Sequence, residues 1–166
     1  MKRTFLEKIG FSETAPPQDK CDQVLHLSFE NQIALWSLRA VLKGPDYSER
    51  VHRQFHKTLP TAAARLAFES IDTVVQTVCD YGIRSLRFNC LCQSALTEDE
   101  QKLIEFFQIA QTDTLFEIRE AARAFVNPPG IDAWVNATLT FFAALETRHS
   151  ESAQGMTALT LSTTIH

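Results

Sequence analysis

The segment from Leu96 to Thr112 places the tightest constraint on the fold, because a complete helix-start signal precedes a strongly apolar helical sequence. Thr97 and Glu100 have the spacing of a capping box. In that motif the threonine hydroxyl accepts a hydrogen bond from the backbone N–H three residues on, and the carboxylate accepts one from the threonine N–H. Leu96 stands where a hydrophobic staple would pack. We therefore predict that a helix begins at Thr97.

The body of this helix has a narrow polar stripe, formed by Glu105, Gln108 and Thr112. A helix with so narrow a polar stripe is buried on most of its sides. Two interpretations are open: the helix lies at the centre of a bundle, or its apolar surface continues into a homodimer interface. In the second interpretation the interface residues are Leu103, Phe106, Phe107 and Ile109.

The remaining sequence predicts an all-α fold, a bundle of about six helices. Five glycines in 166 residues are few for the many turns of a β-sandwich or barrel. Capping and helix-breaking residues bound five further helical segments, at 28–43, 48–57, 61–81, 113–126 and 132–148. A short extended segment lies near residues 83–93. Its first half alternates apolar and polar residues, but a lone strand has no partner, so we expect an extended connector there.

We expect a single helical domain, residues 21–149, between two less regular ends. A chain of 166 residues buries roughly two-thirds of its unfolded surface without help from a metal or a disulfide. Residues 1–20 form an N-terminal arm with two consecutive prolines, and apolar residues such as Ile9 and Phe11 could dock it. Residues 150–166 are rich in serine and threonine and predict a flexible C-terminal tail.

Composition narrows the class of protein. Hydrophobic residues make up 45% of the chain and charged residues 22%, which is ordinary for a globular protein. No window approaches the roughly 20 consecutive apolar residues of a membrane-spanning helix, and the N-terminal sequence lacks the apolar core of a signal peptide. We therefore expect a cytoplasmic protein without a membrane partner. The four cysteines of such a protein are reduced thiols rather than a disulfide framework.

Nucleic acid is also an unfavourable partner. Residues 39–87 hold eight Lys and Arg against five Asp and Glu, an excess far smaller than the basic stripe of a nucleic-acid-binding protein. A helix-turn-helix would read bases with residues 61–70, which offer Arg65 but no Asn, Gln or Lys. The sequence contains no glycine-rich phosphate loop and no G-x-S-x-G elbow. We expect neither nucleic-acid binding nor nucleotide-dependent chemistry.

Two pairs of residues suggest metal or thiol chemistry. Cys90 and Cys92 are one residue apart, so their thiolates could coordinate a soft metal or form a reactive pair. His52 and His56 are one helical turn apart, which lets two imidazoles meet one metal ion. Arg53 occupies the position where zinc proteases carry a glutamate, so that chemistry is excluded. Zinc or iron is the alternative cofactor if the four residues meet; otherwise they are packing and surface residues, and we expect no cofactor.

A third group suggests a small-ligand site. Trp134 lies among the phenylalanines of the last predicted helices, where an apolar pocket could form. Arg87 or Arg119 would be its polar anchor, or would bind an anion. Both arginines also have carboxylates nearby in the sequence, so internal ion pairing is the favoured role.

No complete catalytic constellation emerges from these residues. The sequence therefore favours a non-catalytic protein-interaction or regulatory module that acts as a homodimer or binds another protein. Two alternatives remain, a metal- or thiol-redox-active protein that uses the cysteine and histidine pairs, and a small-ligand-binding bundle.

Overall fold

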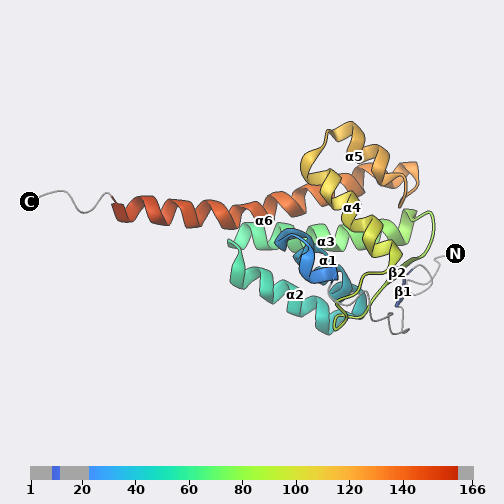
Figure 1. Ribbon diagram of the computed structural model, residues 1–166, viewed down its shortest axis with the longest axis horizontal. Coiled ribbons are helices and arrows are strands. Elements are labelled where there is room, and N and C mark those ends of the chain that lie inside the picture. Colours follow the sequence, from blue (N-terminus) through green and yellow to red (C-terminus); the bar gives the residue numbers. More distant parts are fainter. Residues whose placement is uncertain (1–8, 12–22, 161–166) are drawn as a thin grey trace, which may run out of the picture.

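The computed structural model describes residues 9–11 and 23–160, and within them the chain is an all-α bundle, as predicted (Figure 1). Two 3₁₀ turns, η3 (Gln23–His26) and η4 (Pro128–Gly130), and two three-residue strands, β1 (Ile9–Phe11) and β2 (Leu86–Phe88), complete the described elements. The α-helices are α1 (Phe29–Lys43), α2 (Pro45–Thr58), α3 (Thr61–Tyr81), α4 (Glu98–Thr112), α5 (Leu115–Ala122) and α6 (Ile131–Thr160).

The first two helices are separated by a single residue with a special backbone conformation. Ser28 caps α1, and its hydroxyl accepts a hydrogen bond from the Asn31 N–H at 3.3 Å. Gly44 ends α1 with φ of 130°, a value that side chains disfavour. Pro45 then occupies the first position of α2, where a missing N–H costs nothing. The second helix therefore begins three residues before the predicted Ser48.

Capping boxes start both α4 and α5. The predicted box at Thr97 and Glu100 is present. A second box, at Thr114 and Glu117, was missed in the sequence, where Asp113 was expected to cap the fifth helix. Asp113 instead ends α4, because the Thr114 hydroxyl accepts from the Glu117 N–H and the Glu117 carboxylate accepts from the Thr114 N–H.

The expectation of an unpaired connector near residues 83–93 was wrong for its first half. Strand β2 pairs in parallel with β1, with Ile9 opposite Leu86 and Phe11 opposite Phe88. The partner comes from the N-terminal arm, where a strand had not been predicted. Leu86 and Phe88 are buried while Arg87 between them is exposed, so the alternation in the sequence does reflect a strand with one buried face.

The last helix is longer than predicted. Helix α6 begins at Ile131 and continues to Thr160, so the segment expected to be a flexible tail from residue 150 is helical over most of its length. Residues 161–166 lie outside the described part of the chain. Figure 1 shows the C-terminal half of α6 projecting well beyond the bundle, whereas its first half packs along α3.

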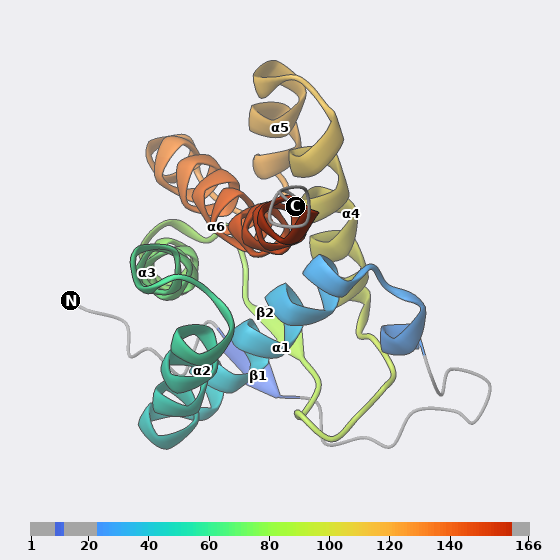
Figure 2. The same ribbon diagram turned by 90° about the vertical axis from the view of Figure 1, so that its left-hand side faces the viewer.

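Helix α4 lies inside the bundle, and this decides between its two interpretations. It packs against α1, α5, α6 and β2 (Figure 2). Phe106 contacts both Phe125 and Trp134, and these two rings stack with centroids 5.7 Å apart. The residues predicted for a homodimer interface therefore lie mostly inside the bundle: Leu103, Phe106 and Phe107 are buried, and Ile109 is half-buried against the core.

Candidate thiol site in the turn between β2 and α4

A buried ion pair positions the connection between β2 and α4. Arg39 of α1 and Glu100 of α4 meet inside the protein, where their side chains are 4% and 0% exposed. The Arg39 Nε lies 2.7 Å from Glu100 Oε1, and one terminal nitrogen lies 2.9 Å from Glu100 Oε2. This two-point geometry is the strongest arrangement that the two side chains can form. It joins residues 61 positions apart in the sequence.

The remaining hydrogen-bonding groups of this ion pair hold the connecting backbone. Arg39 also donates to the carbonyl oxygens of Gln93, at 2.7 Å, and Ala95, at 3.0 Å. Glu100 accepts from the backbone N–H of Asn89, at 3.0 Å, in addition to its capping bond with Thr97. Since unpaired buried polar groups are costly, the ion pair and these backbone groups satisfy one another. The connection is thus anchored from within.

Cys90 and Cys92 lie in the tight turn that this anchor supports. The turn spans Cys90 to Gln93 and is closed by a hydrogen bond from the Gln93 N–H to the Cys90 carbonyl at 3.1 Å. Figure 2 shows the connection looping around the outside of α1 before it reaches α4. Cys90 is half-buried and Cys92 is exposed. We refer to these two residues as the thiol pair.

The two thiols interact directly. The Cys92 thiol donates a hydrogen bond to the Cys90 sulfur, and this bond is the main reason that the pKa of Cys90 lies below its ordinary value. Burial opposes the shift, but the backbone N–H groups of Cys92 and Gln93 and the positive charge of Lys43 reinforce it. The pKa of Cys92 is raised, because its proton is held by Cys90. Cys90 is therefore the thiol that ionises first.

A shallow groove of about 210 Å³ runs beside the exposed thiol. Its walls are mainly apolar, and they include the half-buried Trp36 of α1 and Leu91, the residue between the two cysteines. The Gln93 side-chain oxygen, also in this groove, is buried and has no hydrogen-bond donor among the described groups. The full lining is Val24, Leu25, Gln32, Leu35, Trp36, Arg39, Leu91, Cys92, Gln93 and Ser94.

The side chain of Arg87 is exposed and lines neither the groove beside Cys92 nor the apolar cavity at Trp134. Its backbone N–H donates to Asp99 at 2.8 Å, and Arg84 pairs with the same carboxylate at 2.5 Å. Burial alone would raise the pKa of Asp99, but the hydrogen bonds from Arg84 and from the Arg87 N–H lower it overall. This second ion pair fixes the start of α4 against β2.

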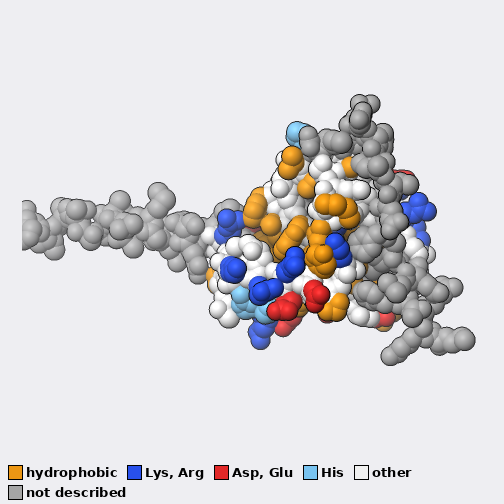
Figure 3. All heavy atoms as spheres, turned by 90° about the horizontal axis from the view of Figure 1, so that it is seen from below, with side chains coloured by type: hydrophobic (Ala, Val, Ile, Leu, Met, Phe, Trp, Pro, Cys, Tyr) orange, Lys and Arg blue, Asp and Glu red, His pale blue; other side chains and the backbone are white. Residues whose placement is uncertain are grey.

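The two histidines lie elsewhere, on the exposed face of α2. Their ring centroids are 4.5 Å apart, and His52 also contacts Phe68 of α3 edge-on. Among the described residues no three His, Cys, Asp or Glu side chains gather as metal ligands, so the predicted set of two histidines with Cys90 and Cys92 is not assembled. The reason is topological, because α2 packs on α1 and α3 while the thiol pair belongs to the approach to α4. Figure 3 shows a face of the molecule on which histidine side chains lie among lysine, arginine and acidic side chains.

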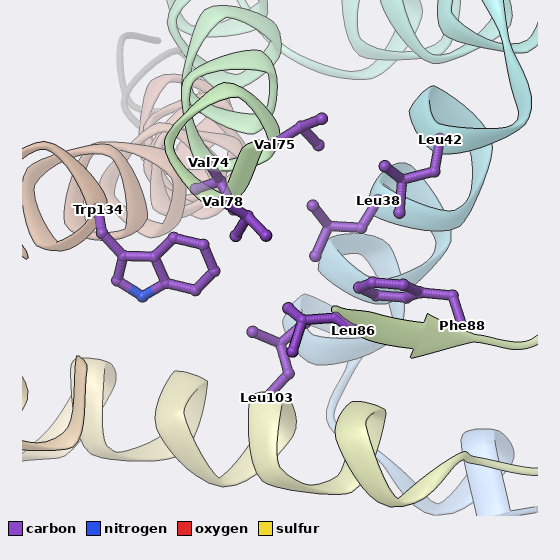
Figure 4. A pocket seen from close by; sticks show the side chains of 9 residues that line it. All are labelled: Leu38, Leu42, Val74, Val75, Val78, Leu86, Phe88, Leu103 and Trp134. Atoms are coloured by element: carbon purple, nitrogen blue, oxygen red, sulfur yellow. The ribbon is translucent and has the colours of Figure 1, made fainter. Parts of the chain in front are cut away.

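Trp134 does line a cavity, but the predicted polar anchors do not. Side chains from α1, α3, α4, α6 and β2 converge on an apolar space of about 10 Å³, roughly enough for one water molecule (Figure 4). The Trp134 N–H is buried without an acceptor among the described groups. Arg119 pairs instead with Asp132 at 2.7 Å on the surface. A cavity of this size does not hold the small ligand that the sequence suggested.

Sequence reasoning missed the partner of Glu100. The signal was present, since Arg39 is a charged residue between Leu38 and Ala40 on an otherwise apolar stretch of helix. A charge in that setting requires a buried counter-charge. Among the described residues, no helix combines the length and the hydropathy needed to cross a bilayer. No protein-family model matches the chain, and searches of curated proteins and of solved structures found no significant similarity.

Proposed function

We propose that this chain is a cytoplasmic, non-catalytic interaction or regulatory module whose state is set by reversible oxidation of the thiol pair to a disulfide. The observation that carries the proposal is that Cys90 and Cys92 lie in one tight turn, closed by the hydrogen bond from the Gln93 N–H to the Cys90 carbonyl, and the lowered pKa of Cys90 supports it. Two cysteines in one turn need only local movement of the backbone to form an S–S bond. The solvent exposure of Cys92 gives an oxidant access.

The reaction proceeds by thiol–disulfide exchange with a small disulfide such as oxidised glutathione. The Cys90 thiolate attacks one sulfur of the oxidant, the oxidant's S–S bond breaks, and one small thiolate leaves. The Cys92 thiol then loses its proton and attacks the Cys90 sulfur of the mixed disulfide, releasing the second small thiolate. The chain loses two electrons and two protons, and the oxidant is reduced to two thiols.

The anchor behind the turn gives oxidation a route to the bundle. Arg39 donates to the Gln93 carbonyl at 2.7 Å and lies 3.4 Å from the Cys90 carbonyl, so both ends of the turn contact one guanidinium. A disulfide between residues two apart constrains the backbone of that turn. The resulting strain acts on Arg39 and hence on the contact between α1 and α4. A change of the turn is thereby coupled to the core.

The experiment is equilibration of the reduced protein with glutathione buffers of graded potential, followed by acid quenching and peptide mass analysis. The expected product is a peptide with both cysteines that has lost the mass of two hydrogens, at one midpoint potential. Cys79→Ser is the matched control and should leave this midpoint unchanged. A thiol pair that stays reduced, or that accumulates only mixed disulfides, would refute the switch.

Self-association remains part of the proposal, but it requires a surface other than α4, because α4 is buried. Two adjacent apolar side chains at the start of α5 support it, since Leu115 is 54% and Phe116 is 71% exposed. Sedimentation velocity over a wide concentration range tests it. A dimer that Phe116→Asp converts to a monomer supports self-association through this surface, whereas a monomer at every concentration removes it.

A further inference from the structure

We propose that His52 and His56, the histidine pair, bind one zinc ion as a two-histidine chelate on the exposed face of α2. The site uses neither residue of the thiol pair and does not depend on the proposed switch. It follows from the contact between the two imidazoles, from the packing that holds them in place, and from the charges around them.

The two imidazoles already lie together. Their ring centroids are 4.5 Å apart and their planes are inclined by 56°. Histidines four residues apart share one face of a helix, which is the spacing that lets two rings bind one zinc ion. Tetrahedral zinc with Zn–N bonds of about 2.0–2.1 Å places two ligand nitrogens about 3.3 Å apart. Rings this close reach that separation by side-chain rotation, so the backbone of α2 need not change.

The packing of α2 holds the histidine pair but leaves its outer side open. The ring of His52 contacts the Phe68 ring of α3 edge-on, with centroids 5.1 Å apart. Val51 and Phe55, which precede the two histidines, are 0% and 2% exposed, so they fix this part of α2 on the bundle. Both histidines are exposed. Two accessible imidazoles on a fixed helix form a pre-organised chelate, because little freedom is lost when the ion binds.

The type and number of donors select the metal. Imidazole nitrogens suit zinc, nickel and copper, whereas magnesium and calcium prefer oxygen ligands. Zinc undergoes no redox chemistry, so it is compatible with the free thiols of the same chain. Within the described residues no third His, Cys, Asp or Glu joins the pair as a ligand. Water therefore fills the remaining positions around the ion, and the ion stays accessible from solvent.

The charges around the histidine pair are largely balanced within α2. The Nε of Arg53 lies 3.8 Å from a carboxylate oxygen of Glu49, and the guanidinium of Arg50 lies over the Tyr47 ring, 5.0 Å from its centroid. Glu49 is also three residues before the first histidine, one turn away on the same side of the helix, so its negative charge favours a cation at the pair. Lys57 is exposed, and salt and water screen its repulsion.

The test is a titration of the reduced full-length chain with zinc chloride, followed through the histidine ring signals in NMR spectra. We expect the signals of His52 and His56 to change together and to saturate at one zinc ion at this site. His52→Ala and His56→Ala should each weaken this binding by about 10-fold or more, because a single imidazole cannot chelate. Cys92→Ser should leave the response of both histidines unchanged, which separates this site from any zinc bound by the thiol pair.

A matched control moves one imidazole off the shared face. His56→Ala combined with Lys57→His keeps the number of histidines but changes their spacing from four residues to five, so it should bind no better than His56→Ala. Zinc should also raise the urea midpoint of the wild type more than that of either alanine variant, because an ion bound only by the folded helix stabilises it. Circular dichroism of each variant separates loss of a ligand from loss of the fold.

Three outcomes would overturn the inference. They are histidine signals that do not respond to zinc, an alanine variant that binds as tightly as the wild type, and full affinity in the variant with five-residue spacing. Zinc shared between two chains, seen as zinc-dependent dimers in sedimentation velocity, would equally contradict a chelate within one chain.

Discussion

Replacing Glu100 by glutamine is the sharpest test of the anchor behind the candidate site. The carboxylate accepts four hydrogen bonds, two from Arg39, one from the Asn89 N–H and one from the Thr97 N–H. A glutamine in the same position offers one oxygen, while its amide nitrogen would face donors. Two of the four bonds are lost, and the buried charge of Arg39 is left without a counter-charge.

The expected loss of stability follows from this geometry. Removing one partner of a buried ion pair costs about 3–5 kcal/mol, because the other charge stays buried and uncompensated. For a chain of this size that loss lowers the melting temperature by about 6–20 °C. With a urea dependence of about 2 kcal/mol per molar, the urea midpoint falls by about 1.5–2.5 M.

The assay is urea unfolding followed by circular dichroism, with Glu98→Gln as the matched control. Glu98 lies two residues earlier, is exposed and pairs with Lys102 at the surface, so its substitution should leave the urea midpoint near that of the wild type. A Glu100→Gln variant that loses less than about 1 kcal/mol would refute the role given to the buried pair.

A double substitution extends the same argument. Replacing a buried ion pair by apolar residues is often neutral, because both charges disappear together. Here Arg39→Met with Glu100→Leu should remain well below the wild type in its urea midpoint. The Gln93 carbonyl and the N–H groups of Asn89 and Thr97 would lose their partners. A double variant as stable as the wild type would show that these backbone bonds contribute little.

Three further predictions concern single groups. The pKa of Asp99 is lowered in the fold, so its ionised carboxylate stabilises the protein fully at pH values above its ordinary pKa, and this stability is lost as the pH falls through the folded-state pKa. Asp99→Asn should therefore lower the urea midpoint at pH 6 but not at strongly acidic pH. An equal effect at both pH values would contradict this. Cys92→Ala removes the hydrogen-bond donor that chiefly lowers the pKa of Cys90, so alkylation of Cys90 by iodoacetamide should begin at higher pH. Cys92→Ser keeps a donor and should shift the onset of alkylation less. Identical pH profiles for the two variants would argue against the hydrogen bond. Gly130→Ala would place a Cβ 2.6 Å from the Tyr81 Cβ, so calorimetry should show a loss of about 1–3 kcal/mol, and an unchanged melting temperature would disprove the close packing.

The helices were predictable because their signals are local. The capping box at Thr97 and Glu100 lies within four consecutive residues, and Gly44 with Pro45 marks the boundary between two helices in a single dipeptide. The missed box at Thr114 is equally local, and it was overlooked because Asp113 is also a favourable capping residue. Local chemistry thus sets where helices start and where they end.

Pairings across the chain were not predictable from local patterns. Strand β2 looked unpartnered because its partner, β1, is three residues long and lies in a segment without periodicity. The contact of Arg39 with Glu100 was missed for a related reason, since no local sequence pattern around either residue indicates its partner 61 positions away. The cysteines were visible as candidates, but their mutual hydrogen bond depends on the turn that this distant ion pair holds.

The parallel pairing of β1 with β2 also sets an order of events during synthesis. Phe11 leaves the ribosome long before Phe88, its partner in the register, has been translated. At about 5–20 residues per second, the 77 intervening additions take about 4–15 s. Throughout that interval β1 lacks its partner β2, while α1, α2 and α3 are made one after another. Strand β1 is therefore translated before the other described elements and is among the last of them to be secured, and nascent chains arrested before Leu86 should present it to any chaperone that binds extended apolar segments.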